Sequence, residues 1–393
     1  MVTTKDLYGD FAILEGGLFD RTLLKMHLHN KQGKLALVSL CIAWLPLVVF
    51  TAIAGTLYSG SQLPFLKDVS MQARMLVALP ILVFIKFAID SKVSAVAKYL
   101  SEALMDEQQR QLVLSKVLYR AKRLTTSLAS EIILLLIVIL ATISLVKGNV
   151  LSELQGGKTS WMAFAKDESV KFSMAGYWAV IISIPLFQFI LLRWLWRYLV
   201  WIILLLRLSR AELILLPTHA DRSGGLGIIM LAQRRFNLIF VAGSVVLSGQ
   251  FIAQIMANRE AFNAIRGEVV AYIIFCVVLI LLPLLFFTSK LVKAKDEGLL
   301  HLSSLAATMS GKFEKEWVND LPIEKKVEED HVDPSMLYDY NGLYDTLQQL
   351  RTVPITVRNI IGMALTLFVP FIPIPLLYFS VPELLQKIVG LLV

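Results

Sequence analysis

Apolar runs of about 20 residues recur along the chain, and no other feature limits its fold as strongly. The stretches LALVSLCIAWLPLVVFTAIAGTLY and EVVAYIIFCVVLILLPLLFF are apolar on every side. A helix of that length crosses about 30 Å of hydrocarbon, whereas strands of a transmembrane barrel alternate apolar and polar residues. Because only 17% of the residues are charged and the mean hydropathy is +0.68, a water-soluble fold is excluded. The chain is predicted to be an all-α, polytopic bundle of transmembrane helices.

Seven stretches are apolar enough to be transmembrane spans. They cover residues 35–58, 73–91, 127–146, 176–197, 236–256, 269–290 and 359–380. When the connecting segments are assigned alternately to the two sides, one side carries 24 Lys and Arg residues and the other carries 8. Since basic residues are enriched in cytoplasmic loops, the N-terminus is predicted to be cytoplasmic and the C-terminus to lie outside. The net charge of +8 reflects these loops, and no nucleic-acid partner is expected.

The chain divides into four segments on the same grounds. Residues 1–34 form a cytoplasmic N-terminal segment, and residues 35–290 hold six spans, with long helical extensions into the cytoplasm at 92–126. Residues 291–352 are predicted to be two amphipathic cytoplasmic helices joined by an acidic loop, because apolar side chains recur there at steps of three and four. Their apolar faces are expected to pack on the extended spans or on a neighbouring subunit of a homo-oligomer.

The last segment, 353–393, contains three prolines inside the predicted seventh span. Pro370, Pro373 and Pro375 lack a backbone donor and interrupt a regular helix. In lipid, the carbonyls that lose their partners must be satisfied by protein or by water in a cavity. The segment is therefore either a kinked span or two half-helices with a re-entrant break, and the second arrangement puts the C-terminus inside. Broken helices at membrane depth are common in transport sites.

Arginine and tryptophan alternate near the predicted cytoplasmic end of the fourth span. Arg193 and Arg197 are one turn apart and share a face, which Trp201 continues one turn later. This spacing predicts a contact of arginine with an aromatic ring or with a lipid phosphate, and snorkelling toward the headgroups is the alternative. The residues assigned to anion or headgroup binding are Arg193, Arg197, Arg207, Arg210, Arg222, Gly224 and Gly225.

The loop before the fifth span, residues 217–227, reads Pro-Thr-His-Ala-Asp-Arg-Ser-Gly-Gly-Leu-Gly. Glycines let the backbone approach a ligand, and free amides at a helix start bind anions, so the loop predicts an anion site or a tight turn. His219 and Asp221, together with His27 and His29, are weak candidates for a divalent-metal site, since imidazole and carboxylate are suitable ligands. A His219–Asp221 hydrogen bond that caps the fifth helix explains the same residues without a metal. No other cofactor is expected.

The run from Ser209 to Gly227, S-R-x-E-L-x-L-x-P-T-H-x-D-x-x-G-G-L-G, resembles a family of multi-span bacterial membrane proteins that has no assigned activity. Two further segments are similar to the same family: ARMLVALPILVFIKFAID at 73–90, and TVPITVRNIIGMALTLFVPFIPIPLLYFSVPELLQKIVGLLV at the end of the chain. The resemblance implies a location in the bacterial inner membrane. It implies no role for His219 or Asp221.

Charged and polar side chains also lie inside the predicted spans. Lys86 and Asp90 share a face of the second span, and Glu131 begins the third. An ionisable residue inside a membrane suggests function by default, and pairing with each other or with the arginines is the structural alternative. The fifth span carries a polar stripe that either binds a neighbouring helix or lines a water-filled path. The stripe consists of Gln250, Gln254, Asn258, Asn237, Ser244 and Ser248.

Three classes of function remain. The first is a channel or transporter for an ion or small solute, in which the fifth span and the broken seventh span line the path. The second is a membrane enzyme, or a protein that binds lipid headgroups, acting through His219 and Asp221 at the cytoplasmic face. The third is a signalling or scaffold protein that acts through 290–358. Catalysis needs several convergent groups, and the sequence offers few, so a channel or transporter is expected, with the bilayer and its anionic headgroups as partners.

Overall fold

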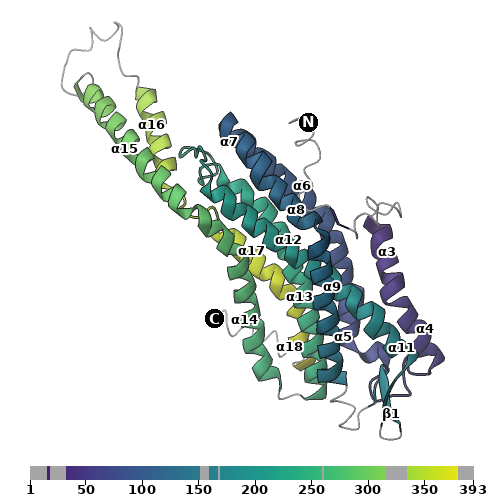
Figure 1. Cartoon of the computed structure of the whole chain (residues 1–393). Helices are drawn as coiled ribbons and strands as arrows, with labels where there is room; N and C mark the ends of the chain where they lie inside the picture. Colours follow the sequence, from purple (N-terminus) through teal and green to yellow (C-terminus); the bar gives the residue numbers. More distant parts are fainter. Residues whose placement is uncertain are drawn as a thin grey trace.

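The protein is a bundle of long helices (Figure 1). The computed structural model describes residues 16–17, 32–150, 159–166, 169–258, 261–315 and 334–378. Within these ranges, six helices are long and apolar enough to cross a membrane. The chain is therefore a multi-pass membrane protein, and the prediction of a helical bundle is confirmed.

The six apolar helices match six of the seven predicted spans. They are Gly33–Ile53, Leu128–Gly148, Met174–Arg210, Leu226–Ala257, Ala264–Phe313 and Val357–Leu377. The remaining span, 73–91, lies in a helix built from α5 (Val69–Gln72), a π-helical turn (Ala73–Ala78) and α6 (Leu79–Ala103). That helix is not among the six. The total of seven spans and the orientation of the chain stay predictions.

Helix α13 (Ile229–Ala257) lies at the centre of the bundle and packs along α6. A Cβ atom at Gly249 would lie 2.6 Å from the Cβ atom of Ala73, so only glycine lets α13 approach the π-helical turn before α6 this closely. On another side, α12 (Ile184–Arg210) packs on α9 (Leu128–Leu145). Small residues at the crossing thus set the spacing of the central helices.

The region 92–126 is helical, as its pattern predicts. Helix α6 continues to Ala103, and the chain returns through α7 (Glu107–Leu112), a π-helical turn (Val113–Leu118) and α8 (Tyr119–Thr126). Ser127 has extended backbone angles and separates α8 from α9. This hairpin forms one end of the bundle, on the side predicted to be cytoplasmic (Figure 1).

Helix α14 (Ala261–Leu281) continues through a 3-10 stretch (Leu282–Phe287) into α15 (Thr288–Phe313), which projects beyond the bundle (Figure 1). Helix α16 (Pro334–Gln348) packs along α15, and the two helices form an arm. The apolar faces predicted to pack on the extended spans or on a neighbouring subunit are thus partly covered within the arm, where Tyr340 and Leu347 are buried, whereas Leu305 and Met336 stay exposed. The predicted acidic loop falls within 316–333, outside the described residues.

A β-hairpin at the opposite end of the bundle departs from the all-helical prediction. Strands β1 (Ala163–Lys166) and β2 (Ser169–Phe172) pair antiparallel, just before the short helix α11 (Met174–Trp178). Nearby, the buried Trp161 ring packs edge-on against Phe65, with 4.9 Å between the ring centroids. Strands of four residues give no pattern that a sequence can reveal, which is why the hairpin was not predicted. The first two described helices of the chain are α3 (Gln32–Ala43) and α4 (Leu45–Ile53).

The final segment is broken where the prolines predict. Helix α17 (Val357–Phe368) ends in a 3-10 turn (Val369–Phe371), and α18 (Pro373–Tyr378) follows. The carbonyl of Pro370 accepts a hydrogen bond of 2.6 Å from the Ser248 hydroxyl of α13. Protein thus satisfies a carbonyl at the break. Residues 379–393 lie outside the described residues, so whether the segment crosses fully stays a prediction.

Candidate functional site

In the glycine-rich loop 217–227, backbone amides bind the carboxylate of Asp221, a residue of the loop itself. The Asp221 carboxylate accepts hydrogen bonds from three backbone amides, those of Ser223 at 2.8 Å, Gly225 at 3.1 Å and Gly227 at 2.9 Å. Gly225 has φ +90°, a conformation that favours glycine. Because these amides are occupied, the geometry favours the tight turn over an external anion at Gly224 and Gly225. Anion binding there stays a prediction.

His219 completes this loop. Its Nδ1 atom lies 2.9 Å from the Asp221 carboxylate, and its Nε2 atom lies 3.4 Å from the Tyr99 hydroxyl of α6. Burial of the Asp221 carboxyl alone would raise its pKa, but the three amides and His219 together outweigh that effect and lower it. Among the described residues, no three His, Cys, Asp or Glu side chains gather at a metal site, and His27 and His29 lie outside those residues.

Arg193 and Arg197 are buried inside the bundle, with 8% and 2% of their surface exposed. The Arg193 side chain donates a 2.9 Å hydrogen bond to the carbonyl of Gly16. The Arg197 guanidinium lies 4.9 Å from the ring centroid of Trp194. Sequence spacing suggested Trp201 as the aromatic partner. The partner is instead one turn earlier, because helical side chains point back toward the N-terminus.

The other three arginines assigned to headgroup binding are more accessible. Arg207 is half-buried, and Arg210 and Arg222 are exposed. They are therefore open to anionic headgroups, whereas the burial of the first pair argues against snorkelling. The assignment of all five arginines to headgroups stays a prediction.

Trp201 belongs to a buried hydrogen-bond network that the sequence did not reveal. Its indole N–H donates to the Gln233 side chain at 2.8 Å, and the Gln233 amide donates to Tyr198 at 3.2 Å and to the carbonyl of Ile280. Tyr198 in turn donates to the carbonyl of Leu279 at 3.0 Å. The network joins α12, α13 and α14. Its polar groups bind one another or helix carbonyls, and these hydrogen bonds hold the three helices together.

The charges predicted inside the second and third spans lie in the interior of the bundle. Lys86 and Glu131 are buried, and Asp90 is half-buried. A side chain on Gly17 would collide with the Glu131 carboxylate. All three charged groups take part in interactions within the structure, so none is isolated. Their placement fits structural pairing.

The polar stripe of α13 divides into two parts. Asn237 and Ser248 are buried and bind the last segment, Asn237 through Thr366 Oγ1 at 2.7 Å and Ser248 through Pro370. Ser244 is also buried and donates to the carbonyl of Phe240 in its own helix. Near the other end of α13, Gln250 is half-buried, and Gln254 and Asn258 are exposed. The inner part of the stripe thus contacts protein, the outer part is accessible, and a path along all six residues stays a prediction.

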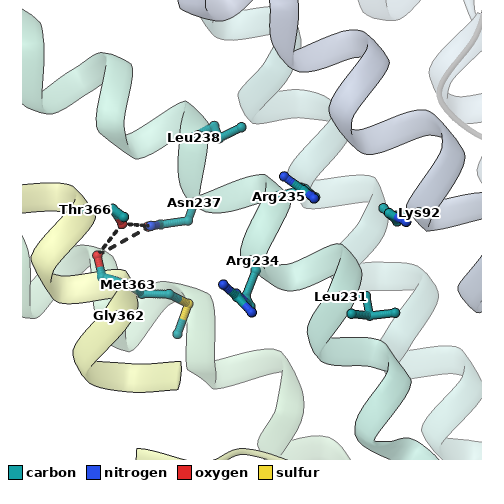
Figure 2. A pocket seen from close by; sticks show the side chains of 9 residues that line it. All are labelled: Lys92, Leu231, Arg234, Arg235, Asn237, Leu238, Gly362, Met363 and Thr366. Atoms are coloured by element: carbon teal, nitrogen blue, oxygen red, sulfur yellow. Dashed lines mark hydrogen bonds between the residues drawn. The ribbon is translucent and has the colours of Figure 1, made fainter. Parts of the chain in front are cut away.

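A basic pocket of about 250 Å³ opens between α6, α13 and α17 (Figure 2). Lys92 comes from α6, and Arg234 and Arg235 come from α13. The lining also includes Leu231, Asn237, Leu238, Gly362, Met363 and Thr366. Sequence reasoning missed the pocket. The available signal was an Arg-Arg pair directly before the fifth predicted span and a lysine directly after the second.

Fold and site together define a multi-pass helical membrane protein with a basic pocket beside a helix broken by prolines. Comparison of the chain with family models, curated proteins and solved structures gave no match. Function must therefore be argued from the geometry of the chain itself.

Proposed function

We propose that the protein is a channel or transporter that moves an ion or small solute along the seam between α13 and the broken segment α17–α18. The seam is formed by Asn237 and Ser248 on α13 and by Met363, Thr366 and Pro370 on the last segment. The observation that supports the proposal is the packing of polar α13 side chains against a helix that prolines interrupt. Discontinuous helices beside polar groups are typical of transport sites, because freed backbone groups can bind the solute.

Few polar contacts hold this seam among the described residues. The polar contacts that join the two elements are the Asn237 amide to Thr366 and Met363, and the Ser248 hydroxyl to Pro370. Water or a polar solute supplies equivalent partners when the helices separate. A broken helix that exchanges protein partners for solute is therefore the gating element of the proposal.

The enzyme alternative has less support. Asp221 is held by three amides and His219, so a carboxylate with a lowered pKa is positioned to stabilise the turn and is a weak proton acceptor.

The scaffold alternative is favoured by one observation. The arm exposes large apolar side chains, with Leu300 73%, Met336 55% and Tyr338 80% accessible. These side chains suit contact with another protein or a second copy of this chain. Assembly into a homo-oligomer through the arm is therefore part of the proposal, as are a bacterial inner-membrane location and membership of the family that the 209–227 run resembles.

A reversible cross-link across the seam tests the proposal. Asn237→Cys and Thr366→Cys are introduced after Cys41 and Cys276 are replaced by alanine. The variant is reconstituted in liposomes, and leakage of trapped potassium chloride and osmotic swelling in small organic anions and polyols are measured with and without an imposed voltage. We expect bis-methanethiosulfonate reagents, which join the two cysteines through disulfides, to stop flux, and reduction of these disulfides to restore it.

A second pair provides the matched control. Thr142 of α9 donates a 2.9 Å hydrogen bond to Gln188 of α12, so Thr142→Cys with Gln188→Cys cross-links two helices away from the seam. Flux should survive this cross-link. Equal block by both pairs, or vesicles that stay tight to every solute with the wild-type protein, would count against transport along the seam.

A further inference from the structure

We propose that the basic pocket between α6, α13 and α17 binds a phosphate ester that carries a hydroxyl or amine group close to its phosphate. The inference rests on the pocket alone and does not depend on transport. Figure 2 shows Lys92, Arg234 and Arg235 around the pocket, with Asn237 reaching toward α17.

Three cations converge on the pocket without an acid to balance them. In the part of the chain that the structure describes, Lys92, Arg234 and Arg235 make no ion pair and no side-chain hydrogen bond. Like charges that share one pocket repel each other, and a bound anion removes that repulsion. Guanidinium groups match the oxygens of phosphate with paired hydrogen bonds, and lysine adds a point charge.

The level at which the pocket lies in the membrane also favours phosphate. Arg234 and Arg235 directly precede the apolar stretch that begins at Phe236, and Lys92 directly follows the predicted span 73–91. The arginines are exposed and Lys92 is half-buried. Cations at the edge of an apolar stretch lie at the level of the lipid headgroups, where phosphate is the abundant anion.

A buried acceptor in the wall adds a second requirement. Asn237 is 4% exposed, and its Oδ1 atom has no hydrogen-bond partner in the described structure. The amide orientation is fixed, because Nδ2 donates to Thr366 Oγ1 at 2.7 Å while the Thr366 hydroxyl donates to the carbonyl of Met363 at 2.8 Å. A buried acceptor without a partner is costly, so the ligand should bring an O–H or N–H donor to this wall.

Size limits the choice further. Drug-sized ligands occupy pockets of about 300–1,000 Å³, so a pocket of about 250 Å³ suits a headgroup or a small metabolite better than a nucleotide. Two sources provide this chemistry. One is the headgroup of a phospholipid with a free hydroxyl or amine, and the other is a soluble ester such as glycerol 3-phosphate.

The first experiment measures binding by calorimetry to the full-length protein, delipidated in a neutral detergent. Glycerol 3-phosphate should bind the wild-type protein, and Arg234→Gln with Arg235→Gln should weaken binding at least tenfold, as expected for lost charge-assisted hydrogen bonds. The control, Lys98→Gln with Lys122→Gln, removes the same charge from exposed positions outside the pocket and should leave affinity unchanged. Equal affinity in all three proteins, or absence of binding to the wild-type protein in both this experiment and the lipid experiment below, would overturn the proposal.

A ligand series tests Asn237 without altering a residue that also holds α17. Glycerol 3-phosphate carries donors that methyl phosphate lacks, so we expect it to bind at least fivefold more tightly. Equal affinity for the two esters would refute the role of the Asn237 acceptor.

Lipid nanodiscs then distinguish the two sources. In native mass spectrometry, a lipid ligand should appear as retained phosphatidylglycerol or phosphatidylethanolamine, in preference to phosphatidylcholine, whose headgroup has no donor. If the ligand is a lipid, glycerol 3-phosphate should bind in nanodiscs of phosphatidylcholine and should not bind in nanodiscs that contain phosphatidylglycerol. If the ligand is soluble, glycerol 3-phosphate should bind equally in both kinds of nanodisc. Retention of phosphatidylcholine as strongly as the other lipids would contradict recognition by the pocket.

Discussion

Replacement of Asp221 by alanine should destabilise the protein by about 2–4 kcal/mol. The carboxylate accepts three amide hydrogen bonds, from Ser223, Gly225 and Gly227, at 2.8–3.1 Å, and it pairs with His219. Hydrogen bonds to a charged group contribute about 1.5–3 kcal/mol each. Their sum overstates the loss, because the Asp221 side chain is 21% exposed and the freed amides regain part of their hydration.

Unfolding in mixed micelles at neutral pH, followed by the fluorescence of the seven tryptophans, measures the loss. Asp221→Asn keeps one acceptor oxygen and should lose about half as much. Asp296→Ala removes an exposed carboxylate from α15 and should change stability by less than about 0.5 kcal/mol. If Asp221→Ala costs no more than the Asp296 variant, the loop does not depend on its internal carboxylate and the interpretation of the site fails.

Three further perturbations follow from contacts in the bundle. The lowered pKa of Asp221 contributes stability that is fully present above the ordinary carboxyl pKa and is lost as pH falls through the lower pKa of the folded state. The stability gap between wild type and Asp221→Asn should therefore be constant above about pH 5 and narrow as pH falls below it, and a gap independent of pH would contradict this. Gln233→Leu leaves the buried Trp201 indole N–H without its acceptor and removes one donor to the Tyr198 oxygen, and it should cost about 1–3 kcal/mol in the same unfolding assay; a neutral effect would mean that the network does not hold the helices. Gly249→Ala forces α13 away from the π-helical turn and should cost about 1–3 kcal/mol, whereas Gly267→Ala, with open space at its Cβ, should be tolerated.

Much of the fold follows from the sequence because lipid-facing helices are apolar on all sides. The predicted span 127–146 and the observed helix Leu128–Gly148 nearly coincide, since charged or polar residues mark both ends. The proline break was also predictable, because proline removes a donor wherever it lies. The His219–Asp221 contact could be anticipated for a similar reason, since only one residue, Ala220, separates the partners in sequence.

The basic pocket could not be predicted in the same way. Lys92 and Arg234 lie far apart in the chain, and only the packing of α6 on α13 brings them together. The burial of Arg193 was equally hidden, because its partner is the carbonyl of Gly16, a group that every residue carries. Sequence patterns reveal periodic helix faces and pairs of residues close in the chain. To predict a site shared by distant helices, one must also know the angle and the depth at which these helices cross.

The length of the arm amplifies a small tilt of α14 into a large movement at the tip of α15. Helix α15 has 26 residues and so measures about 39 Å, and it continues from α14, which lies among the apolar helices. Helices tilt when the hydrocarbon thickness around them changes. If the 3-10 stretch between α14 and α15 transmits the motion, a tilt of about 10° moves the far tip of α15 by roughly 7 Å, a distance set by the length of the helix. A thinner or thicker bilayer would then move the tip of α15, far from the membrane, by more than half the diameter of a helix.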